Sequence, residues 1–419
     1  MKWTRHPKAE NPKEKMFLDG IITLGVILQS ISTGFFLTLD VATHSMQKEW
    51  DFDGDEIVAT GTVGCSVGFL VVGIICLTLI KRISTTSLIL LGVVMTVISW
   101  IFLRIFLCKG CIHWFYAAIL EGGVACGTAI AYTGGVQIIK NRFADPQARK
   151  VRLITASLSV ASGSIIAFLL FDLLKNTDLV IVLMAILSAG FGLAHIVVSI
   201  IPPPVNLEVE EVKKDGYFFT APFAIYLFSV NLSFGVIMTL FNSASSMLHS
   251  TSGHSASQTE LIVTLIGNFI GRALGFVLKA YLRNVLLLFT GMSLAVAILH
   301  ALLLHFWTVP MLIVTLSISS VFSGMIWCLS MSTGSEFFFI AEDRSLGYVF
   351  FGMVFGPLIF GPFSAFIYDA HQVHGHCDCQ CYKAYLIFAA VSSAIAAIGY
   401  LASWFIQRRY YTYRGLPSC

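Results

Sequence analysis

The stretch TSLILLGVVMTVISWIFLRIFL, residues 86–107, contains a single charged residue, Arg104. The hydrocarbon core of a bilayer is about 30 Å thick and an α-helix rises about 1.5 Å per residue, so about 20 apolar residues suffice to cross it. This stretch is therefore predicted to be a membrane-spanning helix. The segments of about ten alternating residues that build a transmembrane β-barrel are absent from the sequence.

Eleven further runs of the same kind are present, which gives twelve predicted spans. They are 17–39, 57–80, 86–107, 113–139, 151–173, 178–201, 219–242, 258–282, 284–306, 308–332, 346–369 and 384–406. Hydrophobic residues make up 57% of the 419 residues and charged residues 12%, against about 25% charged residues in soluble domains. A soluble core could not bury so much apolar surface. The sequence predicts an all-α polytopic membrane protein in a lipid bilayer.

The basic residues predict how these helices are oriented. If both termini are cytosolic, 20 of the 26 Lys and Arg residues lie in cytosolic segments and four in exterior loops. Arg104 and Arg272 fall within helices. An excess of basic residues on the cytosolic side is the normal orientation signal, and an odd number of helices would destroy it. The net charge of +3 is too small to suggest a nucleic-acid partner.

The longest predicted cytosolic connection divides the chain into two halves. The predicted parts are a cytosolic tail (1–16), a six-helix bundle (17–201), a linker (202–218), a second six-helix bundle (219–406) and a cytosolic tail (407–419). Gly73 and Gly275 each lie eight residues before a basic residue at the end of a predicted helix. Two parallel repeats of this kind are expected to bind a solute near the midplane, between the halves.

Twelve helices with basic loops after the second, fourth and eighth resemble the major facilitator superfamily. Three stretches resemble its nodulin-like and monocarboxylate-transporter-like branch, which includes protozoan riboflavin carriers. They are Asp19-Gly20, the segment from Asn268 to Gly275, and the segment from Gly356 to Asp369 with the Cys-rich loop after it. The resemblance implies a transporter, and no cofactor is expected. The predicted location is the plasma membrane, and the predicted state is a monomer.

Two departures from the branch bear on the solute. Proton-coupled monocarboxylate carriers resemble one another in a Lys within helix 1 and an Asp four residues before an Arg in helix 8. Here the first predicted span has no internal Lys, and Asn268 stands four residues before Arg272. The missing titratable groups favour a neutral or weakly anionic heterocycle, with a riboflavin-like vitamin as the first choice. A proton-coupled pyruvate or lactate carrier is the alternative.

Polar residues within the spans are the candidate substrate-binding residues. An arginine at the centre of a bilayer costs about 2.5–3.5 kcal/mol on insertion scales, so Arg272 is expected to face the solute or to bind neighbouring carbonyl groups. Asn268 lies one turn earlier on the same helical face. The resemblance places helices 1, 4, 7 and 10 around the cavity, so polar and aromatic residues of these helices are further candidates for contact with the solute. The alternative is that they hold neighbouring helices together. These candidates are Gln29, Tyr132, Asn231 and Trp327.

Glu121 and Arg104 form the second candidate constellation. A five-residue connection makes their predicted helices antiparallel neighbours, so the two side chains are expected to form a structural ion pair. The alternative is that Glu121 is a buried carboxyl group that couples transport to protons.

Two Gly-Pro pairs in the eleventh predicted span indicate a kink, because proline removes a backbone donor. The pairs are Gly356-Pro357 and Gly361-Pro362, and the functional interpretation is a hinge for gating. The alternative is that glycine and proline are simply frequent in membrane helices.

Five cysteines fall in predicted exterior loops: Cys108, Cys111, Cys377, Cys379 and Cys381. Thiols in an oxidising compartment usually pair, which favours a structural disulfide. The three histidines near the last three cysteines leave a zinc or copper site and free thiols as alternatives.

No nucleotide-binding loop, nucleophile elbow or metal-hydrolase histidine pair is found, so neither ATP-driven transport nor an enzyme is expected. The predicted function is a secondary active or facilitative transporter of a small polar organic nutrient. A non-transporting receptor on the same fold is the rival, which the short predicted tails disfavour.

Overall fold

The computed structural model describes residues 12–50, 54–78, 82–108, 114–143, 145–174, 176–201, 220–252, 258–281, 284–338, 342–371 and 379–413. These residues form helices. The helices are α1 (Pro12–Trp50), α2 (Gly54–Thr78), α3 (Thr85–Cys108), α4 (Trp114–Arg142), α5 (Pro146–Leu174), α6 (Thr177–Ser199), α7 (Ala221–Ser252), α8 (Gln258–Tyr281), α9 (Val285–His305), α10 (Val309–Glu336), α11 (Glu342–Gly352), α12 (Phe355–His371) and α13 (Cys379–Tyr413).

The prediction of an all-α membrane protein with twelve spans is confirmed. Eleven stretches of the described residues are long and apolar enough to cross a membrane, and Ser66–Thr78 of α2 is a shorter apolar stretch. The span predicted at 346–369 consists of α11 and α12, which are separated at residues 353 and 354. Pro357 lies in the first turn of α12, where a missing backbone donor is tolerated, and Pro362 lies inside α12.

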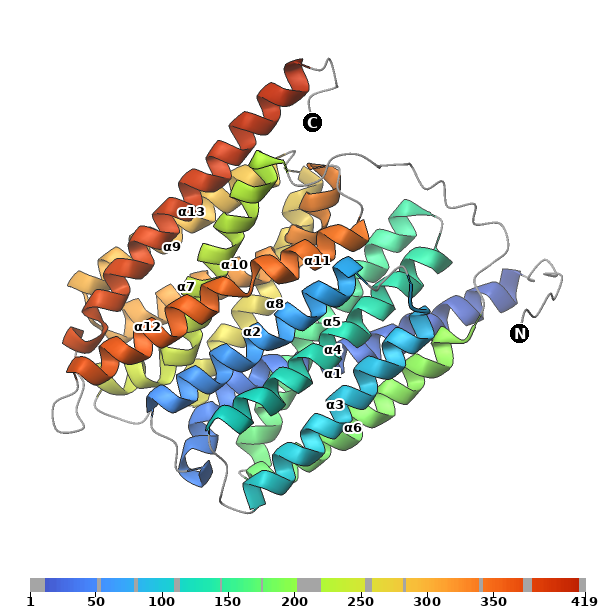
Figure 1. Cartoon of the computed structure of the whole chain (residues 1–419), viewed down its shortest axis with the longest axis horizontal. Helices are drawn as coiled ribbons and strands as arrows, with labels where there is room; N and C mark the ends of the chain where they lie inside the picture. The colour runs from blue at the N-terminus through green and yellow to red at the C-terminus, as the bar shows by residue number, and fades with distance from the viewer. Residues whose placement is uncertain are drawn as a thin grey trace.

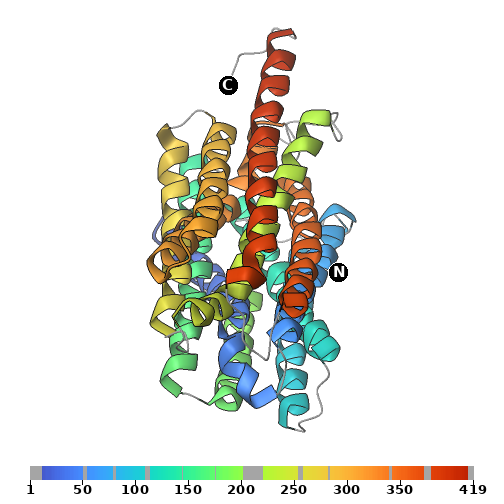
Figure 2. The same cartoon turned by 90° about the vertical axis from the view of Figure 1, so that its left-hand side faces the viewer.

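Several helices extend beyond the predicted spans. The helix α1 begins at Pro12, and α13 continues to Tyr413, so residues of both predicted tails are helical. The cause is that backbone hydrogen bonding continues past the last apolar residue of a span. The N-terminal end of α1 and the C-terminal end of α13 lie at the same end of the bundle, where α13 projects beyond its neighbours (Figures 1 and 2). We refer to it as the termini end. The predicted linker 202–218 lies outside the described residues.

The helices form two groups of six spans. In the first half α1 packs on α5 and α6, and α4 packs on α2 and α3. In the second half α8 packs on α10, and α13 packs on α7 and α9. The halves meet where α2 contacts α11 and α12, and where α5 contacts α8.

Glycines produce equivalent close crossings in the two halves. In the first half, a Cβ atom on Gly163 of α5 would collide with the carbonyl oxygen of Ile31, and one on Gly34 would collide with the α5 backbone. In the second half, a Cβ atom on Gly235 of α7 would lie 2.6 Å from the Cα of Gly356 in α12. Since only glycine permits such contact, the same packing device recurs at α1–α5 and α7–α12.

An ion pair ties α1 to α4 near the termini end. Arg142 is buried, and its Nε lies 2.9 Å from Oδ1 of Asp19. On the neighbouring helix, Arg152 donates from Nε to Oγ1 of Thr23 (3.2 Å). Asp19, which the sequence marks only by its resemblance to a family motif, therefore stabilises the packing of the first half.

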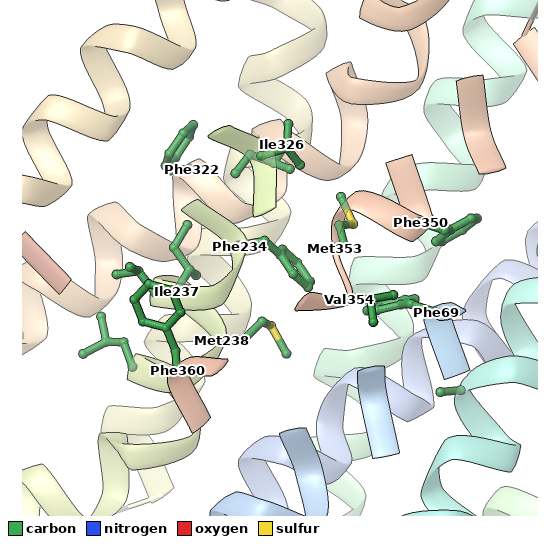
Figure 3. Packing of buried hydrophobic residues seen from close by; sticks show 14 of the residues in the cluster. Phe69, Phe234, Ile237, Met238, Phe322, Ile326, Phe350, Met353, Val354 and Phe360 are labelled. Carbon is green, nitrogen blue, oxygen red and sulfur yellow. The ribbon is translucent and has the colours of Figure 1, made fainter. Parts of the chain in front are cut away.

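The aromatic core crosses the boundary between the halves. Phe69 of α2 stacks on Phe350 of α11, with ring centroids 5.7 Å apart, and lies 5.9 Å from Phe234 of α7. Figure 3 shows Phe69 beside Phe350 and Val354, facing the residues of the second half. The main cluster of buried hydrophobic residues thus includes side chains of both halves.

Candidate functional site

A cavity lies between the two halves, at the depth of the aromatic contact. The empty space within it is about 440 Å³, a figure that includes open solvent at its mouth. The lining residues come from α1, α2, α4 and α5 of the first half and from α8, α10 and α11 of the second: Thr33, Phe69, Ala125, Thr128, Ala129, Tyr132, Val160, Arg272, Trp327 and Phe350.

Arg272 is the charged residue of this lining. Only 2% of its surface is exposed. Its Nε donates to Oδ1 of Asn268 (2.9 Å), one turn earlier in α8. Its Nη1 donates to the carbonyl oxygen (3.1 Å) and to Oγ (3.2 Å) of Ser157 in α5. The guanidinium group therefore links the second half to the first.

The remaining nitrogen of this group, Nη2, has no hydrogen-bond partner among the described residues. A buried donor without a partner costs about 1–3 kcal/mol, and more when it is charged. Because Arg272 lines the cavity, a solute that offers an acceptor oxygen would satisfy this nitrogen. The geometry thus makes Arg272 the strongest candidate for contact with a ligand.

Aromatic rings form much of the cavity wall. The guanidinium carbon of Arg272 lies 5.5 Å from the ring centroid of Trp327, within cation–π range. The ring of Trp327 lies 5.5 Å from that of Phe69 and 6.1 Å from that of Phe350. Tyr132 of α4 adds a further ring. Such walls suit a flat solute.

The first half contributes hydroxyl groups to the cavity. Thr33 of α1 donates to the carbonyl oxygens of Gln29 (3.1 Å) and Thr128 (3.3 Å). Thr128 of α4 donates to the carbonyl oxygens of Val124 (2.9 Å) and Ala125 (3.1 Å). These threonines keep acceptor capacity for a ligand, since each hydroxyl oxygen has two lone pairs.

The structure separates the six predicted substrate-binding residues into two groups. Arg272, Tyr132 and Trp327 line the cavity, and Asn268 lies directly behind Arg272. The other two lie outside the lining. The side chain of Asn231 accepts a hydrogen bond from the backbone N–H of Gly356, and so holds α7 against α12. Gln29 is buried one turn before Thr33.

Two residues of the site, one in the cavity lining and one bound to Arg272, carry no distinctive signal in the sequence. Phe69 is one of 34 phenylalanines, and Ser157 is one of many hydroxyl residues in the spans. Both become important only because α2 and α5 face the second half. A search of the expected cavity helices 1, 4, 7 and 10 passes over them, because they lie in α2 and α5.

Arg104 has a different partner from the predicted one. Its Nε lies 2.8 Å from Oδ1 of Asp178 in α6, and its Nη2 lies 3.3 Å from Oδ2. Its side chain is half exposed, whereas Glu121 is 1% exposed. The prediction assumed that the nearest helix in sequence supplies the partner, but α3 also packs on α6. Arg104 thus joins α3 to α6.

Glu121 continues the face of α4 that lines the cavity. It lies one turn before Ala125, and Ala125, Thr128 and Tyr132 are lining residues. Residues three or four positions apart share one face of a helix. The carboxyl group is buried beside α2, where its Cβ lies 3.1 Å from the position that a Cβ on Gly64 would take.

The cysteine predictions are only partly within the described structure. Cys381, at the start of α13, is buried and disulfide-bonded. The described residues do not include Cys111 and Cys377. They include the backbone, but not the side chains, of Cys108 and Cys379. In the described part of the chain, no three His, Cys, Asp or Glu side chains are grouped so that they could hold a metal ion.

Comparisons with known proteins give similarity in structure alone. No protein-family model matches the chain, and no curated protein matches it in sequence. The structure of the nucleoside transporter NupG matches with a TM-score of 0.63 and 17% identity, over 92% of this chain and 99% of that chain. That of the E. coli fucose:proton symporter FucP matches with a TM-score of 0.59 and 15% identity, over 93% and 99%. The chain therefore has the fold of the major facilitator superfamily.

Proposed function

We propose that the protein is a secondary active or facilitative carrier, which moves a small polar organic nutrient across a membrane by alternating access. The observation that carries the proposal is the cavity between the halves, where the buried Arg272 keeps one donor nitrogen free. Residues of both halves surround the bound solute, so a rocking motion of the halves would expose it to either side.

The proposed solute is a planar heterocycle, with a riboflavin-like vitamin as the first choice. The rings of Trp327, Phe69 and Tyr132 offer flat apolar surfaces, and Arg272 offers a directional contact. The nodulin-like and monocarboxylate-transporter-like branch is part of this proposal and rests on the resemblance in sequence. A nucleoside transporter with a similar fold is a further reason to test heterocycles.

A monocarboxylate such as pyruvate or lactate is the second candidate. The observation in its favour is the positive charge of Arg272, which is buried among lining residues that carry no acidic side chain. A carboxylate would neutralise this charge. The aromatic walls, by contrast, offer little to a small aliphatic acid.

A competition panel tests these proposals directly. Uptake of labelled riboflavin would be measured in transport-deficient cells that express the carrier, in competition with vitamins, nucleobases, amino acids and monocarboxylates. We expect saturable uptake and inhibition by other flat heterocycles. Saturable uptake of pyruvate without competition by riboflavin would refute the first choice and support the second. Binding without counterflow in proteoliposomes would support a receptor.

We propose that Glu121 couples transport to protons, since it extends the lining face of α4. Glu121→Gln removes the titratable group and is expected to flatten the dependence of initial uptake on external pH. The matched control is Asp172→Asn, which neutralises an exposed carboxylate on α5 and should leave the pH profile unchanged. If Glu121→Gln leaves the profile intact, Glu121 has a structural role.

We propose that both termini face the cytosol, that the carrier lies in the plasma membrane and that it acts as a monomer. The distribution of basic residues supports this orientation. The disulfide at Cys381 lies at the start of α13, away from the termini end. Disulfides persist in oxidising compartments, which agrees with an exterior location for this end.

A further inference from the structure

We infer that the cavity recognises the edge of a heterocycle at which a ring carbonyl lies beside an N–H group, as in a lactam or an imide. The inference rests on the proposed carrier function and names the chemical class of its solute. It follows from three features of the cavity: the donor left on Arg272, the acceptors on the opposite half and the aromatic walls.

The first feature concerns the two edges through which the guanidinium group of Arg272 could bind a carboxylate at two points. On each edge, one of the two nitrogens already donates a hydrogen bond within the protein. A guanidinium group binds a carboxylate at two points through its Nε–Nη2 edge or its Nη1–Nη2 edge. Asn268 takes Nε, and Ser157 takes Nη1 with two acceptor atoms. Only Nη2 is left without a partner. A solute therefore meets a single donor nitrogen, which suits one carbonyl oxygen.

The second feature is that two threonines of the first half, Thr33 and Thr128, line the cavity and have hydroxyl oxygens that can accept hydrogen bonds. Thr33 and Thr128 already direct their hydrogens to backbone carbonyl oxygens. What remains on each is lone-pair capacity, which an N–H group of the solute can use. A carboxylate carries no such donor and leaves these acceptors unused.

The third feature is the shape of the cavity wall. Lactam and imide rings are flat, so they can lie against Trp327 and Phe69 while their polar edge reaches the side chains described above. In this arrangement Asn268 and Ser157 are positioning residues. They hold the guanidinium group of Arg272 so that it offers one donor rather than two.

A matched pair of ligands tests the inference. The dissociation constants of lumiflavin and 3-methyllumiflavin would be measured on the purified full-length carrier, with benzoate as a flat carboxylate. Methylation removes only the imide N–H. We expect 3-methyllumiflavin to bind at least tenfold more weakly than lumiflavin and benzoate to bind most weakly. Equal affinity for the two flavins overturns the inference.

A specificity switch provides an independent test. Asn268→Ala frees Nε and so restores a two-point edge on Arg272. We expect the ratio of the benzoate to the lumiflavin dissociation constant to fall at least tenfold. The matched control is Asn242→Ala in α7, whose side-chain amide has no hydrogen-bond partner among the described residues and lies outside the cavity lining. This control should keep the wild-type ratio.

Failure of the inference can be told apart from failure of the proposed function. If the carrier shows counterflow of an aliphatic or carboxylate solute but does not bind lumiflavin, the inference is overturned and the carrier function stands. An unchanged affinity ratio in Asn268→Ala likewise overturns the positioning role. Absence of counterflow for every solute of the panel would count against the carrier function itself and against the inference that rests on it.

Discussion

Arg272→Ala is expected to reduce uptake to background while the protein still reaches the membrane. The substitution removes the free donor nitrogen, the contact with Trp327 and the hydrogen bonds to Ser157. A hydrogen bond to a charged group contributes about 1.5–3 kcal/mol, and each 1.4 kcal/mol corresponds to a factor of ten in affinity. Loss of the ligand contact alone predicts a reduction in affinity of about ten- to one hundredfold.

The measurement is the initial uptake rate at several solute concentrations, normalised to the amount of carrier at the surface. Arg272→Lys is the matched control, because it keeps the positive charge but lacks the planar fork that reaches Asn268, Ser157 and the solute together. Its uptake should lie between that of the wild type and that of Arg272→Ala. A normal KM and a normal maximal rate in Arg272→Ala would rule out contact between Arg272 and the solute.

The second large effect is expected at the crossing of α1 and α5. Gly163→Leu places a side chain where even a Cβ atom would collide with the backbone of Ile31. Overpacking of a core usually costs about 1–3 kcal/mol, and here the obstacle is backbone, which cannot change its rotamer. We expect the free energy of unfolding to fall by more than about 3 kcal/mol, with little folded carrier recovered from membranes.

The matched control for this variant is Gly190→Leu in α6, because a Cβ atom at Gly190 would meet nothing within 4 Å. Both substitutions replace a helical glycine by leucine, so intrinsic helix propensity changes equally. The two variants would be compared by size-exclusion profile and thermal unfolding midpoint in detergent. If both unfold at the same temperature, the close crossing does not contribute to stability.

The predicted spans and the need of Arg272 for a partner were accessible from the sequence for a common reason. Both depend on hydrophobicity. A long apolar run is expected to cross the bilayer, and a cation within such a run needs water or a partner. Helix ends were less accessible, since helical hydrogen bonding continues beyond the apolar stretch, as at Pro12 and Tyr413.

Partners across helices could not be assigned in this way. Neighbours in sequence suggested that Arg104 pairs with Glu121, but the packing of α3 on α6 brings Asp178 to Arg104. An amide in a cavity-facing helix suggested that Asn231 binds solute, but it accepts a hydrogen bond from Gly356. In both cases the partner depends on which helix faces which.

The sequence by itself determined that the chain crosses a membrane twelve times, that it divides into two halves and that Arg272 needs a partner inside the bilayer. These conclusions depend on hydrophobicity and charge, which are properties of each residue. Only the tertiary structure decided that Ser157 and Phe69 of the first half meet Arg272 and Trp327 of the second around one cavity. Helix packing determines this arrangement, because it depends on which faces of helices far apart in the chain contact each other.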